Sequence, residues 1–169
     1  VSYTSKYLEG IVTVKGKSVD DFLQSFYLDL WSGFKINYVL SNSIPVQYNL
    51  DNSNRLNIFL EKNYSHNEEF VIEIFYEGQP ASSGGIGGSF VFSTNDKGNP
   101  VIWTLSQPYG SRDWWPCKDN PADKADSSDV WITADQFFTA VANGVLKDVI
   151  NNSDGTKTYK WHNSYPIAN

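Results

Sequence analysis

The sequence contains no methionine, one cysteine, Cys117, and two histidines, His66 and His162, that lie far apart. A single cysteine cannot form an internal disulfide, and a lone thiol is more often a small buried hydrophobic group than a reactive one. We therefore expect Cys117 to be buried. The absence of an initiator methionine favours a chain that is processed or cut from a longer protein.

Basic residues are also few. The chain has 13 lysines and arginines against 19 aspartates and glutamates, which gives a net charge of -6. This balance argues against a nucleic-acid backbone or an anionic membrane as the main partner. The sequence has neither an apolar run long enough to span a bilayer nor an N-terminal signal pattern, so we expect a soluble chain. Its 169 residues fit a single domain, 1–169.

Apolar and polar residues alternate in many short segments, which is the pattern of half-buried strands. Turn-forming groups rich in Ser, Asn, Asp and Gly separate these segments. The cadence predicts an all-β fold with strands at 8–15, 26–31, 34–40, 46–50, 55–61, 70–78, 89–93, 100–106, 129–133, 145–150 and 156–162.

Two other segments are less regular. The glycine-rich stretch 81–89 is not followed by Gly-Lys-Ser/Thr, so we expect a flexible loop rather than a phosphate cradle. The segment 135–144 has an N-cap-like Asp135 and ends at Gly144, so its local pattern fits a helix about as well as a strand.

The segment 104–124 carries the most specific pattern in the chain. It contains the spacing R-x-x-x-P-C-x-D-x-P-x-x-K, formed by Arg112, Pro116, Cys117, Asp119, Pro121 and Lys124. This motif resembles the N-terminal domain of the aminopeptidase N family of zinc metallopeptidases, the gluzincins that include alanyl aminopeptidases and leukotriene hydrolase. The resemblance extends over most of the chain, through 8–10, 28–30, 76–78, 143–144 and 165–169.

The resemblance implies a curved, saddle-like domain built from a larger mixed sheet and smaller antiparallel sheets. It also implies that 135–144 is a strand that runs into the turn at Asn143 and Gly144, and that 165–169 leads into a catalytic domain. In such a parent enzyme this domain would pack on the zinc-bearing catalytic domain of the same polypeptide. A soluble parent in the periplasm or outside the cell is compatible with the resemblance.

The catalytic motifs of that family are missing from this chain. A gluzincin holds zinc with His-Glu-x-x-His and a distal Glu, and it binds the peptide backbone with Gly-x-Met-x-Asn. Neither motif can be formed from two isolated histidines and no methionine. We therefore expect the chain alone to lack a cofactor and to be inactive, with zinc required only by the parent aminopeptidase.

The resemblance assigns one functional position, Gln107, which stands five residues before Arg112. Family members use a Gln or Glu there to bind the free N-terminus of a peptide substrate. A Gln amide oxygen can accept a hydrogen bond from an ammonium group, and Pro108 favours an extended backbone at Gln107. Tyr109 is a further candidate for the same pocket. The R-x-x-x-P-C-x-D-x-P-x-x-K residues are expected to be structural, with Arg112, Asp119 and Lys124 forming hydrogen bonds or ion pairs.

Other interpretations remain open. A free-standing β-sandwich that binds carbohydrate would use exposed tryptophans, and an immunoglobulin-like module would bind protein without a small-molecule site. Four aspartates provide a weak calcium pattern, which solvated charge explains better. Asn63 and Asn151 each begin a glycosylation acceptor pattern. The four aspartates are Asp119, Asp123, Asp126 and Asp129.

Overall fold

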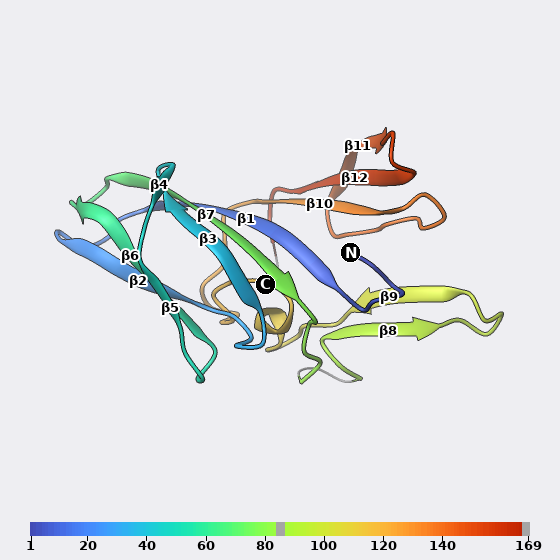
Figure 1. Ribbon diagram of the computed structural model, residues 1–169. Coiled ribbons are helices and arrows are strands. Elements are labelled where there is room, and N and C mark those ends of the chain that lie inside the picture. The colour runs from blue at the N-terminus through green and yellow to red at the C-terminus, as the bar shows by residue number, and fades with distance from the viewer. Residues whose placement is uncertain (84–86, 167–169) are drawn as a thin grey trace.

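The computed structural model describes residues 1–83 and 87–166, which form twelve strands and one short 3-10 helix (Figure 1). Residues 84–86 of the glycine-rich stretch and residues 167–169 of the C-terminal segment lie outside the described residues, so the expectations for those parts stay predictions. Within the described residues, no helix is long and apolar enough to cross a membrane.

The largest sheet has the strand order β1-β7-β3-β4. Its two long strands, β1 and β7, pair along their full length. Glycines on β1 stand opposite aromatic rings on β7, and a Cβ atom at Gly10 would lie 2.7 Å from the Tyr76 hydroxyl. Glycine therefore lets the Tyr76 ring lie against the β1 backbone. The strands are β1 (Leu8–Lys17), β7 (Glu69–Gly78), β3 (Lys35–Ser41) and β4 (Ile44–Pro45).

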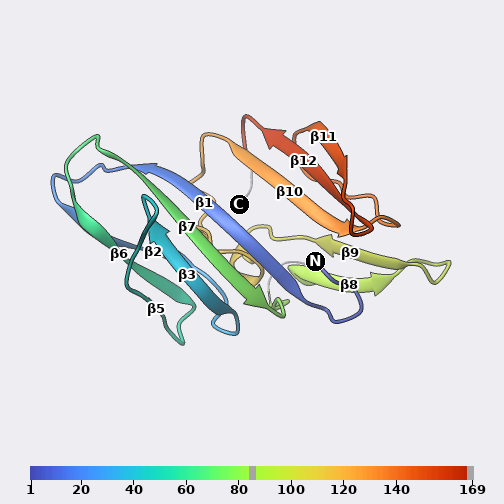
Figure 2. The same cartoon turned by 45° about the horizontal axis from the view of Figure 1, so that its top comes forward.

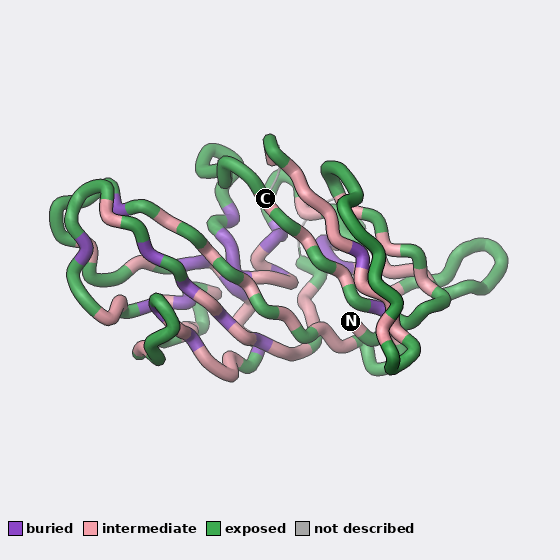
Figure 3. The backbone as a smooth tube through the Cα atoms, turned by 90° about the horizontal axis from the view of Figure 1, so that it is seen from above, coloured by how far each residue is buried: buried purple, intermediate pink, exposed green. Residues whose placement is uncertain are grey.

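A second sheet shares the hydrophobic core with the first. Its order is β2-β6-β5, with β2 at Leu23–Asp29, β6 at Arg55–Tyr64 and β5 at Tyr48–Leu50. Alternate residues of facing strands are buried in one cluster. Figure 3 shows buried segments alternating with less buried ones along the backbone. This burial of one face of each sheet accounts for the two-residue periodicity in the sequence. Fully buried members of the cluster include Leu56, Ile58, Ile72 and Ile74.

The rest of the chain forms smaller sheets beside the long strands (Figure 2). A hairpin pairs β8 (Phe90–Thr94) with β9 (Pro100–Thr104), and a three-stranded sheet has the order β10-β12-β11. Its strands are β10 (Ser128–Asp135), β12 (Thr156–Asn163) and β11 (Val145–Asn151). The 3-10 helix η1 (Ser111–Asp113) lies between β9 and β10 in the sequence.

The predicted all-β class is confirmed, and each segment that the alternating pattern predicts as a strand contains one. Every strand pairing among the described residues is antiparallel, including those of the largest sheet, for which the resemblance implies a mixed arrangement. The described residues therefore form several antiparallel sheets.

The strand expected over 135–144 was wrong. Strand β10 ends at Asp135, whose side chain accepts a hydrogen bond from the Phe137 amide at 3.0 Å, and the chain turns there. Residues 138–142 have no regular structure, and β11 begins only at Val145. The Phe137 side chain is 88% exposed, so the apolar residues that suggested a helix or strand do not follow a buried face. An Asp side chain that bonds a nearby backbone amide is a common cause of such turns.

Candidate functional site

The segment from η1 to Asp119 forms a corner that is attached to the core through β2. Asp29 and Cys117 exchange two backbone hydrogen bonds of 2.7 and 3.1 Å, and the Trp31 amide donates to the Arg112 carbonyl oxygen at 2.8 Å. The corner therefore extends the edge of a core strand, and its backbone position is fixed by that strand.

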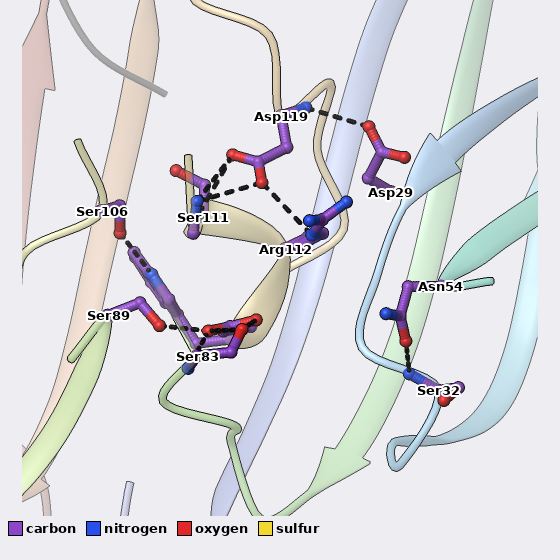
Figure 4. Close-up of polar contacts among 12 residues, drawn as sticks. Asp29, Ser32, Asn54, Ser83, Ser89, Ser106, Ser111, Arg112 and Asp119 are labelled. Atoms are coloured by element: carbon purple, nitrogen blue, oxygen red, sulfur yellow. Dashed lines mark hydrogen bonds and ion pairs between the residues drawn. The ribbon is translucent and has the colours of Figure 1, made fainter. Parts of the chain in front are cut away.

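A buried carboxylate, Asp119, holds the two ends of the corner together (Figure 4). It accepts the backbone N–H groups of Gly110 at 3.0 Å and Ser111 at 3.1 Å, and the Arg112 Nε atom lies 3.5 Å from it. Its own amide donates to the Asp29 carboxylate at 3.2 Å. Hydrogen bonds to a charged carboxylate are stronger than those between neutral groups, so Asp119 stabilises the corner.

The structure thus brings two of the three charged motif residues together. Arg112 and Asp119 meet, whereas Lys124 is exposed and takes part in none of the ion pairs found within residues 1–83 and 87–166. Pro121 is exposed as well, and Pro116 is fully buried.

The two tryptophans of the corner pack inward. Their ring centroids lie 5.8 Å apart, Trp114 also contacts Phe90, and Trp115 packs against the core cluster. This arrangement gives neither indole the open face that a sugar-binding platform needs. Cys117 beside them is buried, as expected. Burial is the main cause that raises the pKa of its thiol, and the nearby Asp119 and Asp29 carboxylates raise it further. The thiol therefore stays protonated and unreactive.

A second buried carboxylate, Asp113, was not predicted from the sequence. It accepts hydrogen bonds from the Ser83 amide at 2.7 Å, from the Ser83 hydroxyl and from the Ser89 hydroxyl. Its backbone carbonyl accepts the Ala81 amide at 2.9 Å. The signal that sequence reasoning passed over is a charged residue placed between Arg112 and a tryptophan pair, in a segment that otherwise supplies buried side chains.

The predicted substrate contact, Gln107, lies on a turn between β9 and η1. Both ends of this turn are anchored. Before it, the Ser106 hydroxyl accepts the Trp114 indole N–H at 3.0 Å, and after it, Gly110 binds the Asp119 carboxylate. The Gln107 side chain itself is exposed, and none of the hydrogen bonds found in the described part of the chain uses its amide. The peptide bond between Gln107 and Pro108 is cis.

The anchored turn 106–110, called here the Gln107 loop, can therefore present an exposed amide from a backbone that is held at both ends. An exposed carboxamide offers one oxygen acceptor and two N–H donors, which suits an ammonium or a peptide group. Tyr109 on the same loop is 55% exposed and adds an aromatic face.

The described residues contain no group of three or more His, Cys, Asp or Glu side chains that could hold a metal ion. The two histidines serve other contacts, His66 with the Val19 carbonyl at 2.9 Å and His162 with Asp129 at 2.8 Å. Asp123 pairs with Lys118 at 2.7 Å rather than with a second carboxylate. Zinc therefore does not fit the residues described here, and the calcium interpretation gains no support.

Comparison with known proteins gives consistent matches. A model of the peptidase M1 N-terminal domain matches residues 2–168. The solved structure of a two-domain M1 zinc metallopeptidase variant bound to L-arginine aligns with a TM-score of 0.79 at 24% identity, covering 94% of this chain and 35% of that one. The M1 zinc metallopeptidase of Deinococcus radiodurans aligns at 0.78 and 24% identity, with 93% and 35% coverage.

A variant of the Deinococcus radiodurans enzyme bound to a Tyr-Ser-Ala substrate also aligns, with a TM-score of 0.78 at 25% identity. That match covers 92% of this chain and 34% of the other. The present chain thus spans about a third of the length of the solved structures that it matches.

Proposed function

Because the chain belongs to the peptidase M1 N-terminal domain family, we propose that it acts as the non-catalytic domain of a zinc aminopeptidase. In this proposal it packs on the catalytic domain of the same polypeptide and turns the Gln107 loop toward the substrate. Gln107 then binds the free amino group of the peptide, and Tyr109 lines the pocket for its first side chain. The zinc chemistry belongs to the catalytic domain.

The observation that carries this proposal is a contrast within the loop. Its backbone is anchored at both ends, whereas the Gln107 side chain makes no hydrogen bond within residues 1–83 and 87–166. The loop is anchored by Trp114 on one side and Asp119 on the other, whereas the Gln107 amide is exposed. An anchored loop loses little conformational entropy when a ligand binds, which favours affinity. A neutral amide also binds an ammonium group without the desolvation cost of a buried carboxylate.

Exposed apolar side chains near the same loop support the packing part of the proposal. Trp103, Leu105 and Tyr109 are each more than a third exposed, and they lie on β9 and the loop that follows it. Exposed apolar side chains that follow one another closely in the sequence are expected where another domain or a ligand covers the surface. The matched structures are about three times longer than this chain, and two of them carry an amino acid or a peptide substrate.

The test uses the full-length peptidase that contains this chain. Gln107→Ala should raise KM for a dipeptide substrate about 10-fold, since a hydrogen bond to a charged group contributes about 1.5–3 kcal/mol. Gln24→Ala, a change at an exposed Gln on β2, is the matched control and should leave KM unchanged. Equal kinetics for Gln107→Ala and the unaltered enzyme would refute the substrate contact.

A further inference from the structure

The Asp113 carboxylate joins three segments that lie far apart in the sequence. It stands at the end of η1, it binds Ser83 across 30 positions, and it binds Ser89 across 24 positions. Asp113 is only 2% exposed, so these neutral donors compensate for the removal of its charge from water. A buried carboxylate is costly to keep, and its contacts extend beyond the corner itself.

Ser89 links this carboxylate to the Gln107 loop. Its hydroxyl donates to Asp113, and its backbone carbonyl accepts the Leu105 amide at 3.2 Å. Leu105 lies immediately before the anchored Ser106 and two residues before Gln107. Ser89 is fully buried, so its two bonds have a fixed direction. The path from Asp113 through Ser89 and Leu105 therefore runs directly to the start of the loop.

We propose that Asp113 is a positioning residue for the substrate site, and that it acts by holding Ser89 so that Gln107 faces the substrate amine. The inference rests on the proposed function of Gln107 and deepens it. Asp119 fixes the far end of the Gln107 loop through Gly110, whereas Asp113 fixes the near end through Ser89 and Leu105. The two buried carboxylates thus hold the loop from opposite ends.

The experiment is a mutant cycle in the full-length peptidase, with KM and kcat measured for one dipeptide substrate. Asp113→Ala and Ser89→Ala should each raise KM about 3- to 10-fold. The KM of Asp113→Asn should stay within about 2-fold of that of the unaltered enzyme. Its amide oxygen can accept the Ser83 N–H while its NH2 group donates to the Ser83 hydroxyl. Ser93→Ala, an exposed hydroxyl on β8, is the control and should have no effect.

The decisive measurement is the change in KM that Asp113→Ala and Ser89→Ala cause in a Gln107→Ala background. A residue that acts through Gln107 should then alter KM by less than about 2-fold, whereas an independent structural effect multiplies KM by the same factor in both backgrounds. The second result would overturn the inference. If Asp113→Ala does not fold, Ser89→Ala in both backgrounds gives the same answer, because it removes one hydroxyl and keeps the backbone bond to Leu105.

The two proposals fail in different ways. If Gln107→Ala raises KM but Asp113→Ala and Ser89→Ala do not, the positioning inference is wrong and the substrate contact stands. If Gln107→Ala itself leaves KM unchanged, both the contact and the positioning role are refuted.

Discussion

The hydroxyl group of Tyr76 donates a hydrogen bond of 2.9 Å to the carbonyl oxygen of Trp114. Tyr76 lies on the core strand β7, where its ring packs edge-on against Phe34 with 5.1 Å between centroids. Trp114 lies in the corner that carries the Gln107 loop. This bond thus connects a core strand to the corner, in addition to the bonds from β2. Burial raises the pKa of the Tyr76 hydroxyl, which keeps it a donor.

Tyr76→Phe should lower the free energy of unfolding by about 1–2 kcal/mol, because the Trp114 carbonyl loses its hydroxyl partner. Tyr3→Phe is the control. The Tyr3 hydroxyl also donates to a backbone carbonyl, that of Ser93 at 2.8 Å, but in an exposed place where water can replace it. Urea unfolding of both variants measures the difference. Equal losses in the free energy of unfolding would show that the bond from Tyr76 stabilises the fold no more than the exposed one from Tyr3.

Asp119→Ala should cost about 2–3 kcal/mol of unfolding free energy, because the Gly110 and Ser111 amides lose a charged acceptor. Asp123→Ala, which removes an exposed carboxylate paired with Lys118, should cost less than about 0.5 kcal/mol. Thermal or urea unfolding provides the comparison. A loss at Asp119 as small as that at Asp123 would contradict the anchoring of the Gln107 loop.

Gly144→Ala should be more destabilising than Gly155→Ala. Both glycines have positive φ angles, +101° and +83°, so alanine is strained at either position by about 1 kcal/mol. A Cβ atom at Gly144 would also lie 2.2 Å from the His162 carbonyl oxygen, whereas nothing lies within 4 Å at Gly155. We expect Gly144→Ala to cost about 2 kcal/mol more in the free energy of unfolding. Equal losses would mean that the start of β11 can shift away from β12.

The Cys117 thiol should react with iodoacetamide at pH 8 far more slowly in the native chain than in urea, because burial raises its pKa and the thiolate is the reactive form. The raised pKa of the folded state also makes the free energy of unfolding depend on pH. The neutral thiol stabilises the fold below the unfolded pKa of about 8.5, and this contribution falls as pH rises above it. The difference in unfolding free energy between the unaltered chain and Cys117→Ala should therefore shrink from pH 8 to pH 10. Equal alkylation rates in the native and unfolded chains would contradict this account.

Much of the fold could be predicted from the sequence because one face of each long strand is buried. Strand β1 alternates between half-buried and exposed residues along its whole length, and the residue types in its sequence alternate in the same way. The turn after Asp135 could not be predicted from residue types alone. Its apolar residues suggest a buried element, but Phe137 and Val141 are largely exposed.

The candidate site was only partly predictable for a related reason. The spacing of Arg112 and Asp119 is local, so the motif suggested that they interact. The bonds from Asp113 to Ser83 and Ser89 join segments 24 to 30 positions apart across a hairpin and a loop. No short-range periodicity encodes such a contact, and it follows only from how the sheets bring the segments together.

The most direct test of the account measures whether Gln107 recognises an amino group. Competitive inhibition constants are compared for a free amino acid and its des-amino analogue, with the unaltered full-length peptidase, Gln107→Ala and the control Gln24→Ala. The account predicts that Gln107→Ala weakens binding of the amino acid about 10-fold and leaves the des-amino analogue unaffected. An equal change for both inhibitors, or no change for either, would contradict the assignment of Gln107 as the contact for the substrate amine.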